Sequence, residues 1–130
     1  KAFEPNINFT LTTAENYKPR IDSVLNVYGQ IIFDVVTEKL NVSSKPFRIF
    51  WNMYYPNSYG ETHTDWPEKG FYSILYMLNT TDGYLQIGEE KIPDEEGQAI
   101  IFPSEIPHFG IGPKQSAVRF NLNMMFKLQE

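Results

Sequence analysis

The two histidines of the chain lie where they could bind a metal ion together with an aspartate. His63 and Asp65 are separated by one residue in the stretch YGETHTDWP, and side chains at positions i and i+2 of an extended segment project to the same side. His108 follows several predicted strands later, far enough for a sheet to bring it opposite. Two imidazoles and one carboxylate form the facial ligand set typical of non-haem Fe(II) sites, which leaves positions open for substrate and O2.

The apolar periodicity predicts elements that could bring these residues together. Between residues 20 and 40, apolar side chains recur at steps of three and four, which indicates one amphipathic helix. One helix followed by several short strands indicates a mainly β sandwich or barrel with the helix on an outer face. The alternating runs predict an edge strand over 3–11 and strands over 46–55, 71–78, 84–87, 98–102, 108–111 and 117–128.

The last predicted strand has two faces of opposite character. One face carries Val118, Phe120, Leu122, Met124 and Phe126, and the other carries Arg119, Asn121 and Asn123. The apolar face suits contact with the helix. A polar face turned into a small barrel costs free energy unless the interior binds a ligand. The strand therefore predicts a binding pocket inside the barrel.

Composition and charge exclude several classes of function. The 130 residues form a single domain, residues 1–130, without cysteine for a disulfide or a thiol nucleophile. The net charge of -5 makes nucleic acid an unlikely partner, because a phosphate backbone requires a basic surface. No apolar run approaches the roughly 18 residues of a membrane span and no signal peptide is visible, so we expect a cytoplasmic protein. The acidic run Asp94, Glu95, Glu96 is expected to be a solvated turn.

Four stretches together resemble the Fe(II)/2-oxoglutarate-dependent dioxygenase superfamily, and most closely its prolyl-hydroxylase-like branch. They are WNMYYPNSYGETHTD, SILYMLNTTDGYLQI, IIFPSEIPHFG and AVRFNLN, and they cover about residues 48–126. The His-x-Asp triplet and the Pro-His segment resemble the family's metal ligands. Asn52 and Tyr54 resemble an Asn-x-Tyr pair that precedes the triplet in several branches, and Arg119 with Asn121 resembles the family's Arg-x-Asn pair.

The resemblance implies a fold and an activity. The fold would be a double-stranded β-helix, or jelly-roll, with a core over about 46–128 and the helix of about 20–40 packed on the outer sheet. His63, Asp65 and His108 would bind Fe(II), and Arg119 would pair with the C5 carboxylate of the cosubstrate 2-oxoglutarate. With O2, and with ascorbate as reductant, the enzyme would hydroxylate a C–H bond, such as that of a prolyl residue in a peptide or protein.

Some positions depart from the family pattern and leave alternatives open. Met77 stands where many relatives have a tyrosine that contacts the cosubstrate, so Tyr54 or Tyr76 would take that role. Met125 replaces a second arginine of the AlkB-like branch, which argues against repair of alkylated bases. Asp65 favours hydroxylation over halogenation, because halogenating relatives lack this carboxylate. The alternatives are an oxygenase acting on a small molecule or nucleic acid, and a non-catalytic jelly-roll that binds a ligand.

Overall fold

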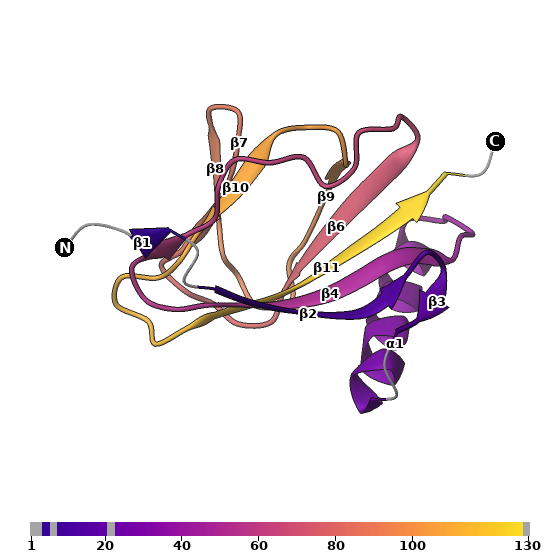
Figure 1. The fold of residues 1–130 in the computed structure, drawn as a ribbon, viewed down its shortest axis with the longest axis horizontal. Helices are drawn as coiled ribbons and strands as arrows, with labels where there is room; N and C mark the ends of the chain where they lie inside the picture. Colours follow the sequence, from indigo (N-terminus) through magenta and orange to yellow (C-terminus); the bar gives the residue numbers. More distant parts are fainter. Residues whose placement is uncertain (1–3, 6–7, 21–22, 129–130) are drawn as a thin grey trace.

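The computed structural model describes residues 4–5, 8–20 and 23–128, which form two facing β-sheets and one helix (Figure 1). The five-stranded sheet has the order β1-β5-β10-β7-β8. Its strands are β1 (Glu4–Pro5), β5 (Ser58–Tyr59), β10 (His108–Ile111), β7 (Tyr84–Ile87) and β8 (Glu90–Pro93). Apart from the parallel pair β1 and β5, its neighbouring strands are antiparallel.

The six-stranded sheet is antiparallel throughout and has the order β3-β2-β4-β11-β6-β9. Its strands are β3 (Lys18–Pro19), β2 (Asn8–Glu15), β4 (Pro46–Tyr54), β11 (Arg119–Lys127), β6 (Phe71–Met77) and β9 (Ala99–Pro103). The predicted strands over 46–55, 71–78, 84–87, 98–102 and 108–111 agree with these bounds within two residues. The prediction of a mainly β chain with one helix is therefore confirmed.

Two strand predictions need correction. The predicted edge strand over 3–11 is divided between two strands: β1 lies at the edge of the five-stranded sheet, whereas β2 lies between β3 and β4 and is not at an edge; Phe3 and residues 6–7 of the predicted range lie outside the described residues. The last strand begins at Arg119 and not at Ala117. The preceding residues Lys114, Gln115 and Ser116 donate their backbone N–H groups to the Asp82 carboxylate, which holds them in a loop.

Helix α1 (Val24–Lys39) begins and ends with ordinary capping residues. The Ser23 side chain accepts a hydrogen bond from the Leu25 N–H, which satisfies one of the free donors of the first turn. Asn41 follows the helix with a φ of 56°, the left-handed conformation that commonly ends helices and that asparagine tolerates. The predicted start near residue 20 is too early, and Ile21 lies outside the described residues.

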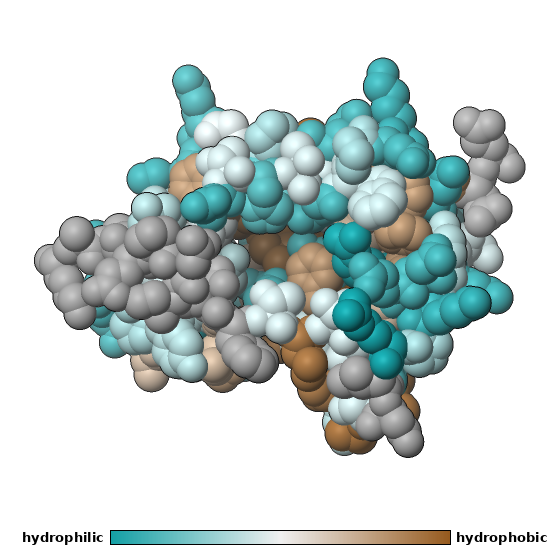
Figure 2. Space-filling view, viewed as in Figure 1, coloured by the Kyte–Doolittle hydropathy of each residue, from teal (hydrophilic) through white to brown (hydrophobic). Residues whose placement is uncertain are grey.

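The apolar positions of α1 divide between a face that packs on the sheet and an exposed face. Phe33 and Val36 are buried against Ile49, Leu122 and Met124 of the six-stranded sheet. A second apolar stripe is exposed, and it comprises Val24, Val27, Tyr28, Ile31 and Val35. Figure 2 shows apolar side chains at the lower edge of the molecule, where Figure 1 places α1. Both stripes have helical spacing, so periodicity alone could not say which one is buried.

The six-stranded sheet is thus covered on one face by α1 and turns its other face toward the five-stranded sheet. Leu122, Met124 and Phe126 of β11 belong to the core with the helix, as predicted from their alternation. A second core of Leu75, Met77, Leu85 and Phe102 lies between the two sheets. Within the described part of the chain, no helix is both long and apolar enough to cross a membrane.

Candidate metal centre and pocket

His63, Asp65 and His108 meet at the inner side of the five-stranded sheet. His108 is the first residue of β10, and the segment with His63 lies antiparallel to it through a single bridge. In that bridge the backbone N–H of each histidine donates a hydrogen bond to the backbone carbonyl oxygen of the other, at 3.0 Å. Asp65 Oδ1 lies 3.3 Å from Nε2 of both imidazoles. Each residue offers a ligand atom, and these atoms lie within 4.8 Å of one another, as a shared metal ion requires.

Hydrogen bonds fix the tautomers that metal binding requires. His63 Nδ1 lies 2.7 Å from the Glu61 carbonyl oxygen, and His108 Nδ1 lies 2.8 Å from the Ile106 carbonyl oxygen. A carbonyl oxygen can only accept, so each Nδ1 carries the proton. In the neutral ring Nε2 then presents its lone pair toward Asp65, which is the arrangement found in metal-binding histidines.

The second oxygen of Asp65 is held by residues behind the site. Ser73 Oγ donates to Asp65 Oδ2 at 2.6 Å, and Asn123 Nδ2 donates to the same oxygen at 3.2 Å. Ser73 is fully buried and also contacts Ser104 Oγ at 2.8 Å. Sequence reasoning missed Ser73 and Ser104. The signal for Ser73 was a lone hydroxyl on the inward side of the otherwise apolar run FYSILYM.

The charges of the site favour an ionised carboxylate. Burial raises the pKa of Asp65, but hydrogen bonds from His108 and His63, which the imidazoles donate when Nε2 is protonated, and the hydrogen bond from Ser73 outweigh it and hold the pKa well below its usual range. The hydrogen bond to Asp65 is the largest cause of a raised pKa at His63, and it exceeds the opposing effect of burial. Asp65 therefore remains an anionic ligand, and a proton and a metal ion compete for His63.

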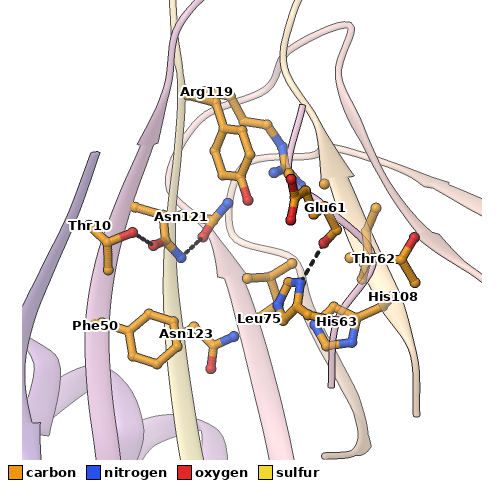
Figure 3. A pocket seen from close by; sticks show the side chains of 15 residues that line it. Thr10, Phe50, Glu61, Thr62, His63, Leu75, His108, Arg119, Asn121 and Asn123 are labelled. Carbon is orange, nitrogen blue, oxygen red and sulfur yellow. Dashed lines mark hydrogen bonds between the residues drawn. The ribbon is translucent and has the colours of Figure 1, made fainter. Parts of the chain in front are cut away.

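A pocket of about 290 Å³ opens beside this cluster, between the two sheets. Its size is near the lower end of small-molecule pockets, roughly 300 Å³. On one wall, Thr10 Oγ1 donates to Asn52 Oδ1 at 2.8 Å and Asn52 Nδ2 donates to Asn121 Oδ1 at 2.9 Å. Figure 3 shows this chain of side chains facing His63 across the pocket. The apolar part of the lining comprises Phe50, Leu75 and Leu85.

Arg119 lines the end of the pocket away from the histidines (Figure 3). Its side chain is 1% exposed, and its Cζ lies 4.8 Å from the centroid of the Tyr54 ring. Burial raises the pKa of Tyr54 more than Arg119 lowers it, so the phenol stays protonated. Gly110 lets the guanidinium approach, because a Cβ there would lie 2.5 Å from Arg119 Nη1 and 3.0 Å from the Tyr54 hydroxyl.

The structure corrects the interpretation of the acidic run that follows β8. Glu95 and Glu96 are exposed, as expected of a solvated turn, but Asp94 is 3% exposed. Its Oδ2 lies 2.7 Å from Arg119 Nε. The sequence could not reveal this pair, because the two residues are far apart in the chain and acidic runs usually face water.

The remaining aromatic candidates lie in different surroundings. Tyr76 packs on the helix side of its strand, whereas the neighbouring Met77 points between the sheets. Of the two tyrosines proposed to contact the cosubstrate, Tyr54 is thus the one in the pocket. Trp66, close to Asp65 in the chain, packs edge-on against Phe47 at 4.9 Å. Tyr59 is half-buried in β5.

The residues present fit both Fe(II) and 2-oxoglutarate. Two neutral imidazoles and one carboxylate oxygen are a suitable donor set for Fe(II), and all three converge. At the other end, Arg119 Nη2 is buried and has no hydrogen-bond partner among the described residues. An unpartnered buried donor of this kind costs free energy unless an acceptor such as a carboxylate occupies the pocket.

Comparisons with known proteins found similarity in structure alone. No protein-family model matches the chain, and no curated protein matches it. An oxidoreductase of the 2OG-Fe(II) oxygenase family from Burkholderia pseudomallei is similar with a TM-score of 0.69 and 10% identity, covering 92% of this chain and 66% of that chain. A Pseudomonas putida prolyl-4-hydroxylase is similar with a TM-score of 0.59 and 12% identity, and the likeness covers 94% of this chain and 69% of that chain.

A third solved structure belongs to a different group of proteins. It is a predicted oxalate decarboxylase from Thermotoga maritima, with a TM-score of 0.53, 14% identity, and 85% and 78% of the two chains covered. At these identities the likenesses establish a shared fold and not a shared activity. The chain thus has a mainly β fold of the cupin and jelly-roll type, which 2-oxoglutarate–Fe(II) oxygenases also use.

Proposed function

We propose that this protein is an Fe(II)- and 2-oxoglutarate-dependent oxygenase with a double-stranded β-helix fold, which hydroxylates a C–H bond of its substrate. One observation carries the proposal: both histidines of a His-Asp-His cluster and a buried arginine with a free donor line the same pocket. A pure metal-binding site does not need the arginine, and a pure anion-binding site does not need the cluster.

Each group of residues has a defined task under this proposal. His63, Asp65 and His108 would hold the metal with positions left open, and Ser73 and Asn123 would keep Asp65 in its orientation. Arg119 would bind the C5 carboxylate of 2-oxoglutarate, with Tyr54 beside it and Asn52 and Asn121 along the wall. The bound metal and cosubstrate would supply the activation of O2. The apolar side chains of the lining would keep water from the reacting centre.

The metal and cosubstrate assignments are tested together by anaerobic spectroscopy. Protein mixed with Fe(II) and 2-oxoglutarate should develop a weak visible charge-transfer band, and His63→Ala should abolish it because a ligand is lost. Thr64→Ala, at an exposed position next to His63 and outside the lining of the pocket, is the matched control and should keep the band. A band of full intensity in His63→Ala would remove the metal assignment.

The same titration tests Arg119. Arg119→Ala should weaken 2-oxoglutarate binding on the order of 2–5 kcal/mol, about 30-fold or more, because the carboxylate loses a charge-assisted partner in a buried pocket. Arg119→Lys should retain only part of the affinity for 2-oxoglutarate, since lysine offers no planar pair of donors. An unchanged affinity in Arg119→Ala would instead favour a cupin-type metal site that does not use 2-oxoglutarate.

For the substrate, we propose a prolyl residue in a peptide or protein. The support is the likeness of the sequence segments to prolyl hydroxylases, together with the negative net charge, which opposes a nucleic acid. Mass spectrometry of proline-rich peptides, incubated with protein, Fe(II), ascorbate and 2-oxoglutarate, should show the gain of one oxygen atom. Turnover of a free amino acid or a methylated oligonucleotide, with prolyl peptides unmodified, would refute the substrate and leave the oxygenase proposal standing.

A further inference from the structure

The buried ion pair between Arg119 and Asp94 connects the two sheets at the end of the pocket. Arg119 is the first residue of β11, and Asp94 directly follows β8. Both side chains are almost completely buried, at 1% and 0% exposure. Either charge alone would be costly there, whereas the pair compensates both. Asp94 does not line the pocket, so any effect on a ligand must act through Arg119.

Asp94 is itself held in one orientation. Thr81 Oγ1 donates to Asp94 Oδ2 at 2.6 Å and accepts the Gly83 N–H at 2.8 Å. The Asp94 N–H donates to the Gly83 carbonyl oxygen at 3.2 Å. A Cβ on Gly83 would overlap the Ile111 carbonyl oxygen and lie 3.0 Å from Asp94 Oδ2, so this approach requires glycine. The carboxylate therefore has little freedom to rotate.

The contact uses only one edge of the guanidinium. Asp94 Oδ2 accepts a hydrogen bond from Arg119 Nε, while Asp94 Oδ1 is buried without a hydrogen bond among the described residues. A bidentate pair would have used Arg119 Nη2 as well. Among the described residues Nη2 instead has no hydrogen-bond partner, and Nη1 lies close to Gly110 in the lining of the pocket. The arrangement leaves Nη2 free to donate to a second carboxylate.

We propose that Asp94, oriented by Thr81, is a positioning residue that turns the Nη edge of Arg119 toward the pocket and so sets the preference for 2-oxoacids with a terminal carboxylate. The inference rests on the proposed function, since it concerns the same cosubstrate. Asp94 does not touch the cosubstrate. Its removal should therefore affect only ligands that depend on the orientation of Arg119.

Binding selectivity separates a positioning role from a merely structural one. Calorimetry on the Mn(II)-loaded protein, where no turnover occurs, would compare 2-oxoglutarate with 2-oxopentanoate, which has the same chain length and no terminal carboxylate. Wild type should prefer 2-oxoglutarate. Asp94→Asn should reduce this preference about tenfold, because the orientation of the guanidinium is loosened, and should leave 2-oxopentanoate and Mn(II) affinities unchanged. Glu95→Gln, in the same turn but exposed, is the matched control.

Thr81→Val provides a milder variant if Asp94→Asn does not fold, because it removes one hydrogen bond to Asp94 and leaves the ion pair. It should lower the same preference by a smaller factor. Selectivity unchanged in a folded Asp94 or Thr81 variant, or an equal loss for both 2-oxoacids, would overturn the inference alone. A wild-type protein without any preference would overturn the proposed function together with it.

Discussion

At the scale of single residues, the two oxygens of Asp65 have different partners. Oδ1 faces both imidazoles, and Oδ2 accepts hydrogen bonds from Ser73 and Asn123. The carboxylate is thus oriented from behind before any metal arrives. Preorganised ligands lose less freedom on binding, and the residues that orient them often matter nearly as much as the ligands.

Ser73→Ala should lower the affinity for a divalent metal about tenfold, because Asp65 loses the hydrogen bond that fixes its orientation. The substitution removes a single oxygen atom, so the fold should remain intact. Isothermal titration with Mn(II) measures the affinity, and Ser43→Ala, away from the site, serves as the control. Equal Mn(II) affinities for the wild type and Ser73→Ala would show that Asp65 is positioned by other contacts.

At the scale of elements, β11 and α1 differ in how well the sequence predicts them. The alternation along β11 correctly separated Arg119, Asn121 and Asn123, which face the pocket, from the side chains that face the helix. For α1 the helix itself was predicted, but its buried face was not. A strand has only two faces, whereas a helix with apolar residues around most of its circumference can pack in several rotations.

Phe33→Ala should lower the free energy of unfolding by about 3–5 kcal/mol, because the ring is fully buried in the core and packs edge-on against Phe126. Ile31→Ala is the matched control from the exposed stripe, where the side chain is 52% exposed, and should change the free energy by less than about 0.5 kcal/mol. Urea denaturation measures both. The reverse order of effects would mean that the helix packs with its other face.

The Asp82 carboxylate links its own turn to the loop over 114–116, which precedes β11. Asp82→Asn should destabilise the protein at neutral pH by about 1 kcal/mol, as loss of a helix N-cap does, since a carboxylate that accepts three backbone N–H groups is removed. Urea denaturation at neutral pH measures the loss, with Glu89→Gln as control.

The pH dependence of that loss has a definite sign. Burial is the largest single effect and raises the pKa of Asp82, but the backbone N–H groups of Ser116, Gln115 and Lys114 together outweigh it and hold the pKa below its ordinary 3.8. A lowered pKa in the folded state contributes stability above pH 3.8, and this contribution disappears as the pH falls through the folded value. The difference in the free energy of unfolding between wild type and Asp82→Asn should therefore disappear at acid pH. A gap that persists at low pH would contradict this account.

At the scale of the whole molecule, the sequence specified the metal cluster more fully than its surroundings. His63, Asp65 and His108 were predicted from residue type, spacing and family resemblance, and the fold brings them together. Asp94 and Ser73 were not, because their roles depend on partners that only the packing of one sheet on the other creates. Residue type and local spacing indicate the chemistry of a side chain, whereas its partners depend on contacts between segments that are distant in the sequence.

The single bridge between His63 and His108 gives the site a mechanical consequence. The segment from Gly60 to Gly70 has little regular structure, and this bridge is one of few main-chain links that tie it to the five-stranded sheet. A metal held by His63, Asp65 and His108 would add a second tie across the same gap. Ligand binding lowers the population of locally open states in proportion to occupancy. Removal of the metal with a chelator should thus make this segment more susceptible to proteases and to amide exchange, while the six-stranded sheet stays protected.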